Sequence, residues 1–196
     1  MKIVVIEPIG LNENIVNEYK KEFEIMGHEL ITYNNRVEND DKLITRAKNA
    51  DIIILTNIPL TRNMIINCSK LKLISVAFTG IDHIDLAACK EQDIMVCNAS
   101  GYANQAVAEL TIGMIINLLR NVINCDKATR KEETREELIG NELFGKTMGI
   151  VGTGCIGMKV AELGAAFGCN LLGHDKVERE KAKDIGVKYT TCCFCN

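Results

Sequence analysis

The sequence lacks several features that would indicate particular classes of protein. No apolar run approaches the ~20 residues that a membrane-spanning helix needs. There is no block of basic residues, and the formal net charge of -3 argues against a nucleic-acid partner or an anionic membrane held by electrostatics. Near the N-terminus Glu7 interrupts the first apolar run, so no secretory signal peptide is expected. We therefore expect a cytoplasmic protein.

The remaining composition is ordinary. Of the 196 residues, 47% are hydrophobic and 25% are charged, and such fractions are typical of globular domains. A chain of this length forms one large domain or two small ones.

Cysteine is plentiful, and the nine cysteines fall into two groups. Six are scattered, mostly through apolar segments, where a reduced cysteine behaves as a small hydrophobic residue. Without a secretory signal we expect no disulfide framework. The other three are Cys192, Cys193 and Cys195. They lack the two-residue gap between paired zinc ligands and have no histidine nearby, so we expect no metal site.

Short β-rich apolar runs alternate with helical patterns along the first hundred residues. Strands are predicted over residues 2–7, 28–33, 52–56, 73–77 and 94–98. Apolar residues at helical spacing follow the first strand, and short helices are predicted over residues 61–68 and 86–91. Continuous apolar runs of this kind are typical of an α/β fold with a parallel sheet covered on both faces. We expect a small doubly wound domain.

A long helix is predicted next, over residues 104–120. Val107, Leu110, Met114 and Leu118 recur on one face and are expected to be its buried stripe. Residues 126–142 follow, with 10 charged residues in 17, and mixed signs of charge predict a solvated connector. We place the domain boundary after residue 100, with residues 1–100 in one domain and 101–196 in the other.

A glycine-rich turn follows the strand predicted over residues 147–151. Gly152, Gly154 and Gly157 form the pattern G-x-G-x-x-G, which permits a tight turn, close approach of a pyrophosphate and close packing of helix on strand. The next strand, residues 170–174, ends at Asp175, where a ribose-binding acid is expected. A carboxylate favours NAD over NADP, although Lys176 follows it. The alternative is a glycine turn kept for packing alone.

Three segments resemble the D-isomer-specific 2-hydroxyacid dehydrogenases, the family of phosphoglycerate and glycerate dehydrogenases. They are VAFTGIDHIDLAAC (residues 76–89), NASGYANQAVAELTIGMII (residues 98–116) and LFGKTMGIVGTGCIGMKVA (residues 143–161). The resemblance implies an α/β fold with a flavodoxin-like N-terminal substrate domain and a Rossmann NAD-binding domain. It also implies a small 2-hydroxy or 2-oxo acid substrate and a possible homodimer.

The resemblance assigns residues to both ligands. Thr79, Gly80 and Ile81 are expected to meet the substrate carboxylate, with Thr79 also approaching the cofactor. The backbone amides of Cys155 and Ile156, together with Gly152, Gly154 and Gly157, are expected at the NAD pyrophosphate. Asp175 is expected at the adenosine ribose.

The family's catalytic arginine, glutamate and histidine belong to its later half, so we expect no catalytic residue in this chain. His28, His83 and His174 are expected to be structural or surface residues. Only two or three strands of the nucleotide domain are predicted, the third over residues 187–190, so we expect an incomplete Rossmann domain and a truncated, inactive form. Two alternatives stay open: a non-catalytic NAD-binding or redox-sensing module, and an interaction fragment that binds no ligand.

Overall fold

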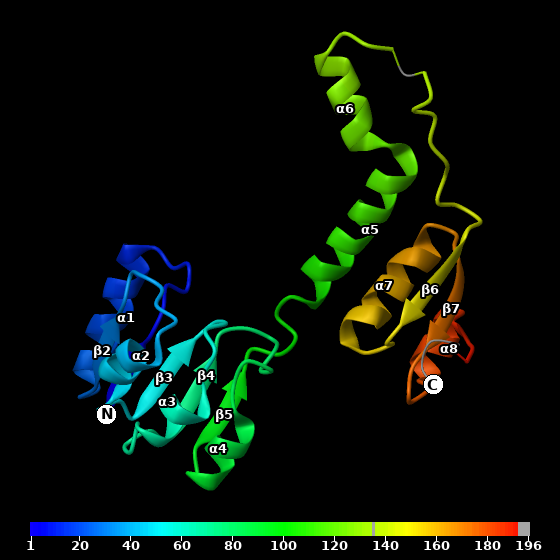
Figure 1. Cartoon of the computed structure of the whole chain (residues 1–196). Coiled ribbons are helices and arrows are strands. Elements are labelled where there is room, and N and C mark those ends of the chain that lie inside the picture. Colours follow the sequence, from blue (N-terminus) through cyan, green and yellow to red (C-terminus); the bar gives the residue numbers. More distant parts are fainter. Residues whose placement is uncertain (135, 192–196) are drawn as a thin grey trace. The chain divides into compact units, whose positions relative to one another are not determined.

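The computed structural model describes residues 1–134 and 136–191. The chain divides into two compact units, Met1–Ser100 and the part from Gly101 onward (Figure 1). We describe each unit by itself.

Unit 1 is a five-stranded parallel sheet with helices between the strands. Its order along the chain is β1 (Lys2–Val5), α1 (Glu13–Ile25), β2 (Glu29–Thr32), α2 (Asp40–Ala47), β3 (Ile52–Leu55), α3 (Arg62–Ile66), β4 (Leu73–Val76), α4 (Leu86–Glu91) and β5 (Met95–Asn98). The strands lie in the order β2-β1-β3-β4-β5, and all pairs are parallel. This is the flavodoxin-like order, so the predicted fold class is confirmed for unit 1.

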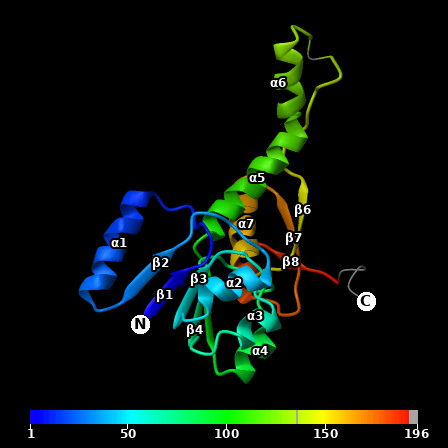
Figure 2. The ribbon, with the colours of Figure 1, turned by 60° about the vertical axis from the view of Figure 1, so that its left-hand side comes forward.

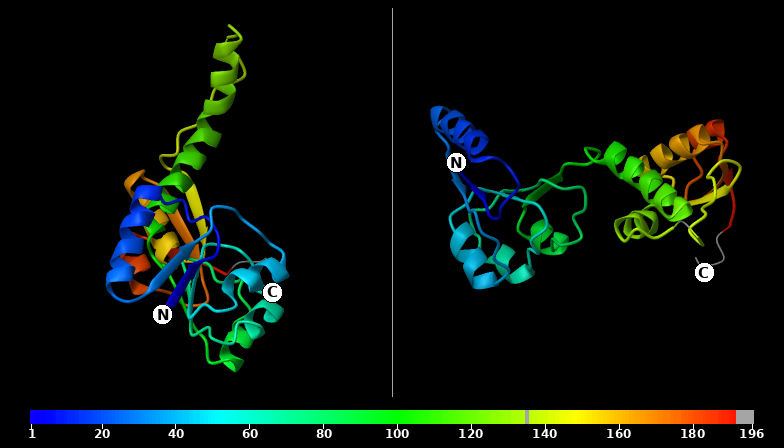
Figure 3. Two further views of the ribbon diagram at one scale, coloured as in Figure 1. Left: turned by 90° about the vertical axis from the view of Figure 1, so that its left-hand side faces the viewer. Right: turned by 90° about the horizontal axis from the view of Figure 1, so that it is seen from above.

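The main core of unit 1 lies on one face of its sheet. Alternate strand residues such as Val4, Ile53 and Ile74 are fully buried against α2, α3 and α4, as the two-residue period of a strand requires. Helix α1 lies on the opposite face (Figure 3) and has no buried residue. The sheet is therefore packed unequally on its two faces.

Short polar residues begin the helices of unit 1. The side chains of Asn12, Asn39, Thr61 and Asp85 each accept a hydrogen bond from a backbone N–H in the first turn of α1, α2, α3 and α4. Such caps satisfy donors that have no partner within the helix. Helix α2 was not predicted, because only Leu43 and Ala47 of its eight residues are buried.

Unit 2 begins with two helices and continues as a small parallel sheet. Its elements are α5 (Asn104–Arg120), α6 (Val122–Arg130), β6 (Thr147–Val151), α7 (Cys155–Ala166), β7 (Asn170–His174), α8 (Glu180–Ile185) and β8 (Lys188–Tyr189). The strands lie side by side in the order β6-β7-β8 (Figure 2). Among the described residues β6 pairs only with β7, and the side chain of Val151 is 74% exposed.

The predicted buried stripe of the long helix was wrong. Ala108 and Ile112 are the buried residues of α5, and they belong to the core that this helix shares with α7. The predicted residues are exposed instead: Val107, Leu110, Met114 and Leu118. Helix α5 is apolar on more than one face, so periodicity alone did not identify the face that packs on α7.

The charged segment over residues 126–142 is mostly exposed where it is described, as its charge pattern predicted. Its first residues, 126–130, form the end of helix α6.

No single helix in the described chain is both long and apolar enough to cross a membrane. Only α5 and α6 taken together pass that test, and they are bent by 58° relative to each other.

Candidate functional site

The glycine turn joins the end of β6 to the start of α7. Gly152 has a φ of +90°, a conformation that residues with a side chain rarely adopt. A Cβ added at Gly157 would lie 2.0 Å from the carbonyl oxygen of Gly152, so the turn cannot hold a side chain there. A Cβ added at Gly154 would meet nothing within 4 Å. Two glycines are therefore required by the fold, whereas the third leaves open space beside the backbone.

The N-terminus of α7 has the features of an anion site. Gly154 is its N-cap, so no side chain caps this 12-residue helix, and its first turn contains no acidic residue. The backbone N–H groups of a first turn, here those of Cys155 and Ile156, have no partner within the helix. Together with the helix dipole they favour a phosphate or carboxylate.

Asp175 lies beside this turn because β6 and β7 are paired in register. Val151 is opposite His174, and the N–H of Gly152 donates to the His174 carbonyl at 2.7 Å. The Oδ2 atom of Asp175 accepts hydrogen bonds from the Thr153 N–H at 2.7 Å and the Thr153 hydroxyl at 3.0 Å. The hydrogen bond from the Thr153 N–H, and to a smaller extent that from the Thr153 hydroxyl, lowers the pKa of Asp175 below its usual value. An ionised carboxylate is thus fixed against the glycine turn.

Sequence reasoning missed two residues of this arrangement. Thr153 is fully buried, and its hydroxyl lies 2.7 Å from the phenol oxygen of Tyr189 on β8. The position of Thr153 inside the G-x-G pattern was a signal that could have been used. Tyr189 is 36 residues away along the chain, and no local pattern predicts that contact.

The predicted substrate loop of unit 1 follows β4. The side-chain amide of Asn98, at the end of β5, donates to the Thr79 carbonyl at 2.6 Å, and the Ile81 carbonyl accepts from the Ile84 N–H at 3.1 Å. A Cβ added at Gly80 would make only an ordinary contact, with Asp82 Oδ2 at 3.8 Å. The packing of unit 1 therefore does not require glycine at this position, and the backbone there is accessible.

The buried carboxylate of Glu7 connects the ends of β1 and β3. Glu7 follows β1 and is 1% exposed. Its Oε1 accepts three backbone N–H groups of residues 56–58, and its Oε2 accepts from Arg36 Nη1 at 2.7 Å. Burial would raise the pKa of Glu7, but these hydrogen bonds outweigh it and lower the pKa. Glu7 joins the ends of β1 and β3, the point where the strand order reverses and ligands often bind.

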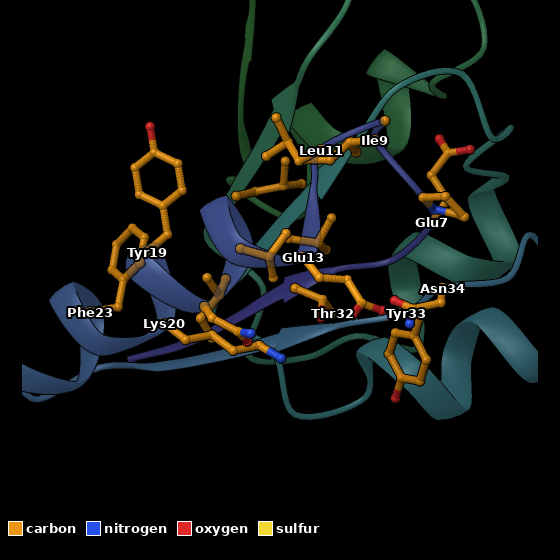
Figure 4. A pocket seen from close by; sticks show the side chains of 17 residues that line it. Glu7, Ile9, Leu11, Glu13, Tyr19, Lys20, Phe23, Thr32, Tyr33 and Asn34 are labelled. Carbon is orange, nitrogen blue, oxygen red and sulfur yellow. The ribbon is translucent and has the colours of Figure 1, made fainter.

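A separate hollow lies beneath helix α1 in unit 1, and Glu7 is among the residues that line it (Figure 4). It has a volume of about 670 Å³ and lies between α1 and the sheet, with Val5, Ile54 and Phe23 among its apolar lining residues. None of the predicted site residues lines it. Because its lining contains none of those residues, we do not identify it with the candidate site.

The three histidines lie in different local environments. His28 precedes β2, where its Nδ1 is 3.3 Å from the N-terminal amine. His83 accepts the Leu60 N–H through its carbonyl, and its buried Nε2 has no hydrogen-bond partner among the described residues. The Nδ1 of His174 lies 3.0 Å from the Thr190 carbonyl.

The cysteines only partly match the expectation of buried, apolar positions. Cys68 and Cys89 are buried in unit 1, but Cys97 and Cys155 are exposed. Cys125 and Cys169 are intermediate in exposure. The group Cys192, Cys193 and Cys195 lies outside the described residues, so the expectation that it holds no metal stays a prediction.

Comparisons with known proteins agree with this geometry. The chain is 36% identical over 151 residues to D-3-phosphoglycerate dehydrogenase of Methanocaldococcus jannaschii, a match that covers 76% of this chain and 29% of the relative. The structure resembles D-lactate dehydrogenase from Aquifex aeolicus complexed with NAD and lactic acid (TM-score 0.83, 30% identity, 97% of this chain and 56% of that chain). It also resembles an acyclic imino acid reductase in complex with NADPH and D-Arg (TM-score 0.84, 28% identity, 97% and 60% of the two chains).

The chain spans between 29% and 49% of the length of three curated relatives that it matches. A family model, described as D-isomer specific 2-hydroxyacid dehydrogenase, catalytic domain, matches residues 3–185. That match covers nearly the whole chain. The chain therefore belongs to the D-isomer specific 2-hydroxyacid dehydrogenases.

Proposed function

We propose that this chain binds NAD through unit 2 and a small 2-oxo or 2-hydroxy acid through unit 1. The corresponding activity is that of an NAD-dependent oxidoreductase acting on the CH–OH group of such an acid. The observation that carries the proposal is the glycine turn at the uncapped start of α7, with the Asp175 carboxylate hydrogen-bonded to that turn. A turn kept only for packing needs neither an open position at Gly154 nor a fixed acid beside it.

The residues present fit a dinucleotide. The N–H groups of Cys155 and Ile156 would meet the pyrophosphate, since the approach past Gly154 is open. Asp175 would accept hydrogen bonds from the adenosine ribose. When bound as NADH, the cofactor supplies the hydride for reduction of the 2-oxo acid.

In unit 1 the loop of Thr79, Gly80 and Ile81 would bind the substrate carboxylate through backbone N–H groups, with Thr79 also close to the cofactor. The Asn98 side chain supports this role because it holds the Thr79 carbonyl and so fixes the loop.

We further propose that the 196 residues alone bind NADH without robust turnover. The family resemblance assigns proton transfer and carboxylate binding to a histidine, a glutamate and an arginine that match no position in this sequence. We do not assign these roles to His28, whose ring contacts the N-terminal amine, or to His174, whose ring contacts the Thr190 carbonyl. Nor do we assign them to His83, whose ring Nε2 is buried.

Two measurements test this function. Calorimetric titration of NADH into the chain should give saturable binding, and failure to bind would favour an interaction fragment. An assay of NADH oxidation with hydroxypyruvate, pyruvate and glyoxylate should give no robust turnover. Robust turnover would contradict the proposed need for further residues. If NADH binds but no 2-oxo acid affects its affinity, a non-catalytic NAD-binding or redox-sensing module becomes the better account.

We propose a homodimer formed through α5. Its exposed stripe supports this, because Leu110, Met114 and Leu118 are 63%, 57% and 78% exposed although all are apolar. Light scattering after gel filtration should give a dimer mass for the wild type and a monomer mass for Leu110→Glu. A monomeric wild type would contradict the proposal.

We also propose a cytoplasmic location. Cys68 and Cys89 support it, since both are free thiols packed in the core of unit 1, as expected in a reducing compartment. Imaging of a fluorescently tagged full chain in its native host tests the location.

A further inference from the structure

A line of hydrogen bonds connects three segments of unit 2 at Asp175. The Arg179 backbone N–H donates to the Tyr189 phenol oxygen at 3.1 Å. That oxygen lies 2.7 Å from the Thr153 hydroxyl, which in turn lies 3.0 Å from Asp175 Oδ2. The line joins the start of α8, the end of β8 and the glycine turn to the acid at the end of β7.

The chemistry of the groups fixes the direction of every bond. An ionised carboxylate only accepts, so the Thr153 hydroxyl must donate its proton to Asp175. The Thr153 oxygen can then only accept from the Tyr189 O–H, and the Tyr189 oxygen accepts the Arg179 N–H. No alternative arrangement of protons satisfies all four groups. Since the Thr153 side chain is fully buried, water does not substitute for these partners.

The two carboxylate oxygens of Asp175 have different surroundings. Oδ2 accepts both the N–H and the hydroxyl of Thr153. By contrast, Oδ1 accepts a long hydrogen bond from the Val177 N–H at 3.5 Å. Rotation of the carboxylate would break both bonds to Thr153. One oxygen is therefore anchored, and the other is available to a ligand.

We infer that Thr153 and Tyr189 are positioning residues that make the proposed site selective for a dinucleotide with a free ribose 2′-hydroxyl over one with a 2′-phosphate. This inference rests on the proposed function. A ribose hydroxyl can donate to the available carboxylate oxygen, whereas a phosphate brings only acceptors and negative charge. The lowered pKa of Asp175 is consistent with a carboxylate that stays charged in this role.

The anchoring matters because cations lie close by in the sequence. Lys176 and Arg179 are both exposed and follow Asp175 within four residues. An Asp175 side chain free to turn away could pair with such a cation and leave room for a 2′-phosphate. When Thr153 anchors it, the Asp175 carboxylate stays beside the turn and repels a 2′-phosphate.

The experiment measures the Kd of NADH and of NADPH by calorimetry for the full 196-residue chain and its variants. Thr153→Val and Tyr189→Phe each remove one hydroxyl with little change of shape, and Thr153→Ser keeps the hydroxyl. Thr147→Val and Tyr19→Phe are matched controls at exposed positions. The unfolding midpoint of each variant is recorded beside its affinities.

We expect the wild type to prefer NADH. Thr153→Val and Tyr189→Phe should each lower the ratio of the NADPH Kd to the NADH Kd by about fivefold, since one hydrogen bond contributes about 1 kcal/mol. Thr153→Ser and both controls should keep the wild-type ratio. In the double variant this ratio should fall by less than the product of the two single reductions, because both residues act through Asp175.

Three results would overturn the inference or the function beneath it. If both cofactors weaken by the same factor in Thr153→Val and Tyr189→Phe, the two residues are merely structural. If the wild type binds both cofactors equally well, the selectivity does not exist. If the wild type binds neither cofactor, the proposed function itself fails. Should Thr153→Val unfold, Tyr189→Phe decides alone, because it leaves the buried turn unchanged.

Discussion

The two units differ in how polar groups are used at the ends of their strands. In unit 1 a buried carboxylate, Glu7, is fully used by three backbone N–H groups and Arg36. In unit 2 the start of α7 has no side-chain cap and Gly154 borders open space. Polar groups satisfied within the protein serve stability, whereas groups left open beside a fixed acid are suited to a ligand. Disrupting the first kind should reduce stability, and disrupting the second should reduce binding.

The largest expected effect is at Gly157. Gly157→Ala puts a Cβ 2.0 Å from the Gly152 carbonyl oxygen, which the turn cannot accommodate without moving. We expect the free energy of unfolding of unit 2 to fall by ~3 kcal/mol, the cost of overpacking, and the Kd for NADH to rise because the displaced turn no longer fits the pyrophosphate. Calorimetry measures the Kd, and thermal unfolding should show unit 2 destabilised.

Gly154→Ala sharpens the comparison between folding and binding. Its Cβ meets nothing within 4 Å, so the unfolding midpoint should match that of the wild type. The NADH Kd should still rise about tenfold, because the second glycine of the pattern lets the backbone approach a pyrophosphate. Wild-type affinity in Gly154→Ala would mean that no phosphate lies at this turn.

The opposite behaviour is expected in unit 1. Glu7→Leu removes the acceptor of the Thr56, Asn57 and Ile58 N–H groups, and the last of these is buried. We expect the free energy of unfolding of unit 1 to fall by about 3 kcal/mol, with the NADH affinity of unit 2 unchanged. Hydrogen exchange followed by mass spectrometry resolves the two units.

Glu38→Gln is the matched control for Glu7→Leu. Glu38 also pairs with Arg36, but its side chain is 67% exposed. Its loss should cost less than about 1 kcal/mol. Equal losses in the two variants would contradict the structural role given to Glu7.

The smallest effect concerns alkaline pH and is confined to unit 1. Burial raises the pKa of the Cys68 thiol to about 11. The folded state therefore holds this proton more tightly than the unfolded state does. Its contribution to stability is complete below pH 9 and is lost as the pH rises toward 11. Urea denaturation should give a decline over this range that is absent in Cys68→Ala, and an equal decline in both proteins would contradict the assignment.

Much of the fold was predictable because local signals agreed. The five strands of unit 1 and the turn of Gly152, Gly154 and Gly157 were recognised from apolar runs and spacing. Asp175 was expected at the end of its strand, and the structure has it there. Its role toward a ribose remains a prediction.

The missed features depend on contacts between distant residues. Leu110 and Ala108 lie on different faces of an apolar helix, and only the packing of α7 decides which face is buried. The sequence alone does not show that Glu7 is buried, because its backbone partners follow β3, about 50 residues along the chain. Tyr189 reaches Thr153 only because β8 pairs with β7. Sequence periodicity carries no information on such partners.

The most direct test of the central claim is an NMR titration of NADH into the ¹⁵N-labelled chain. The account predicts saturable shifts concentrated at the amides of Gly154, Cys155, Ile156 and Asp175, with the unit 1 core residues Ile53 and Ile74 unmoved. Shifts concentrated instead around the hollow beneath α1, or no shifts at all, would contradict it.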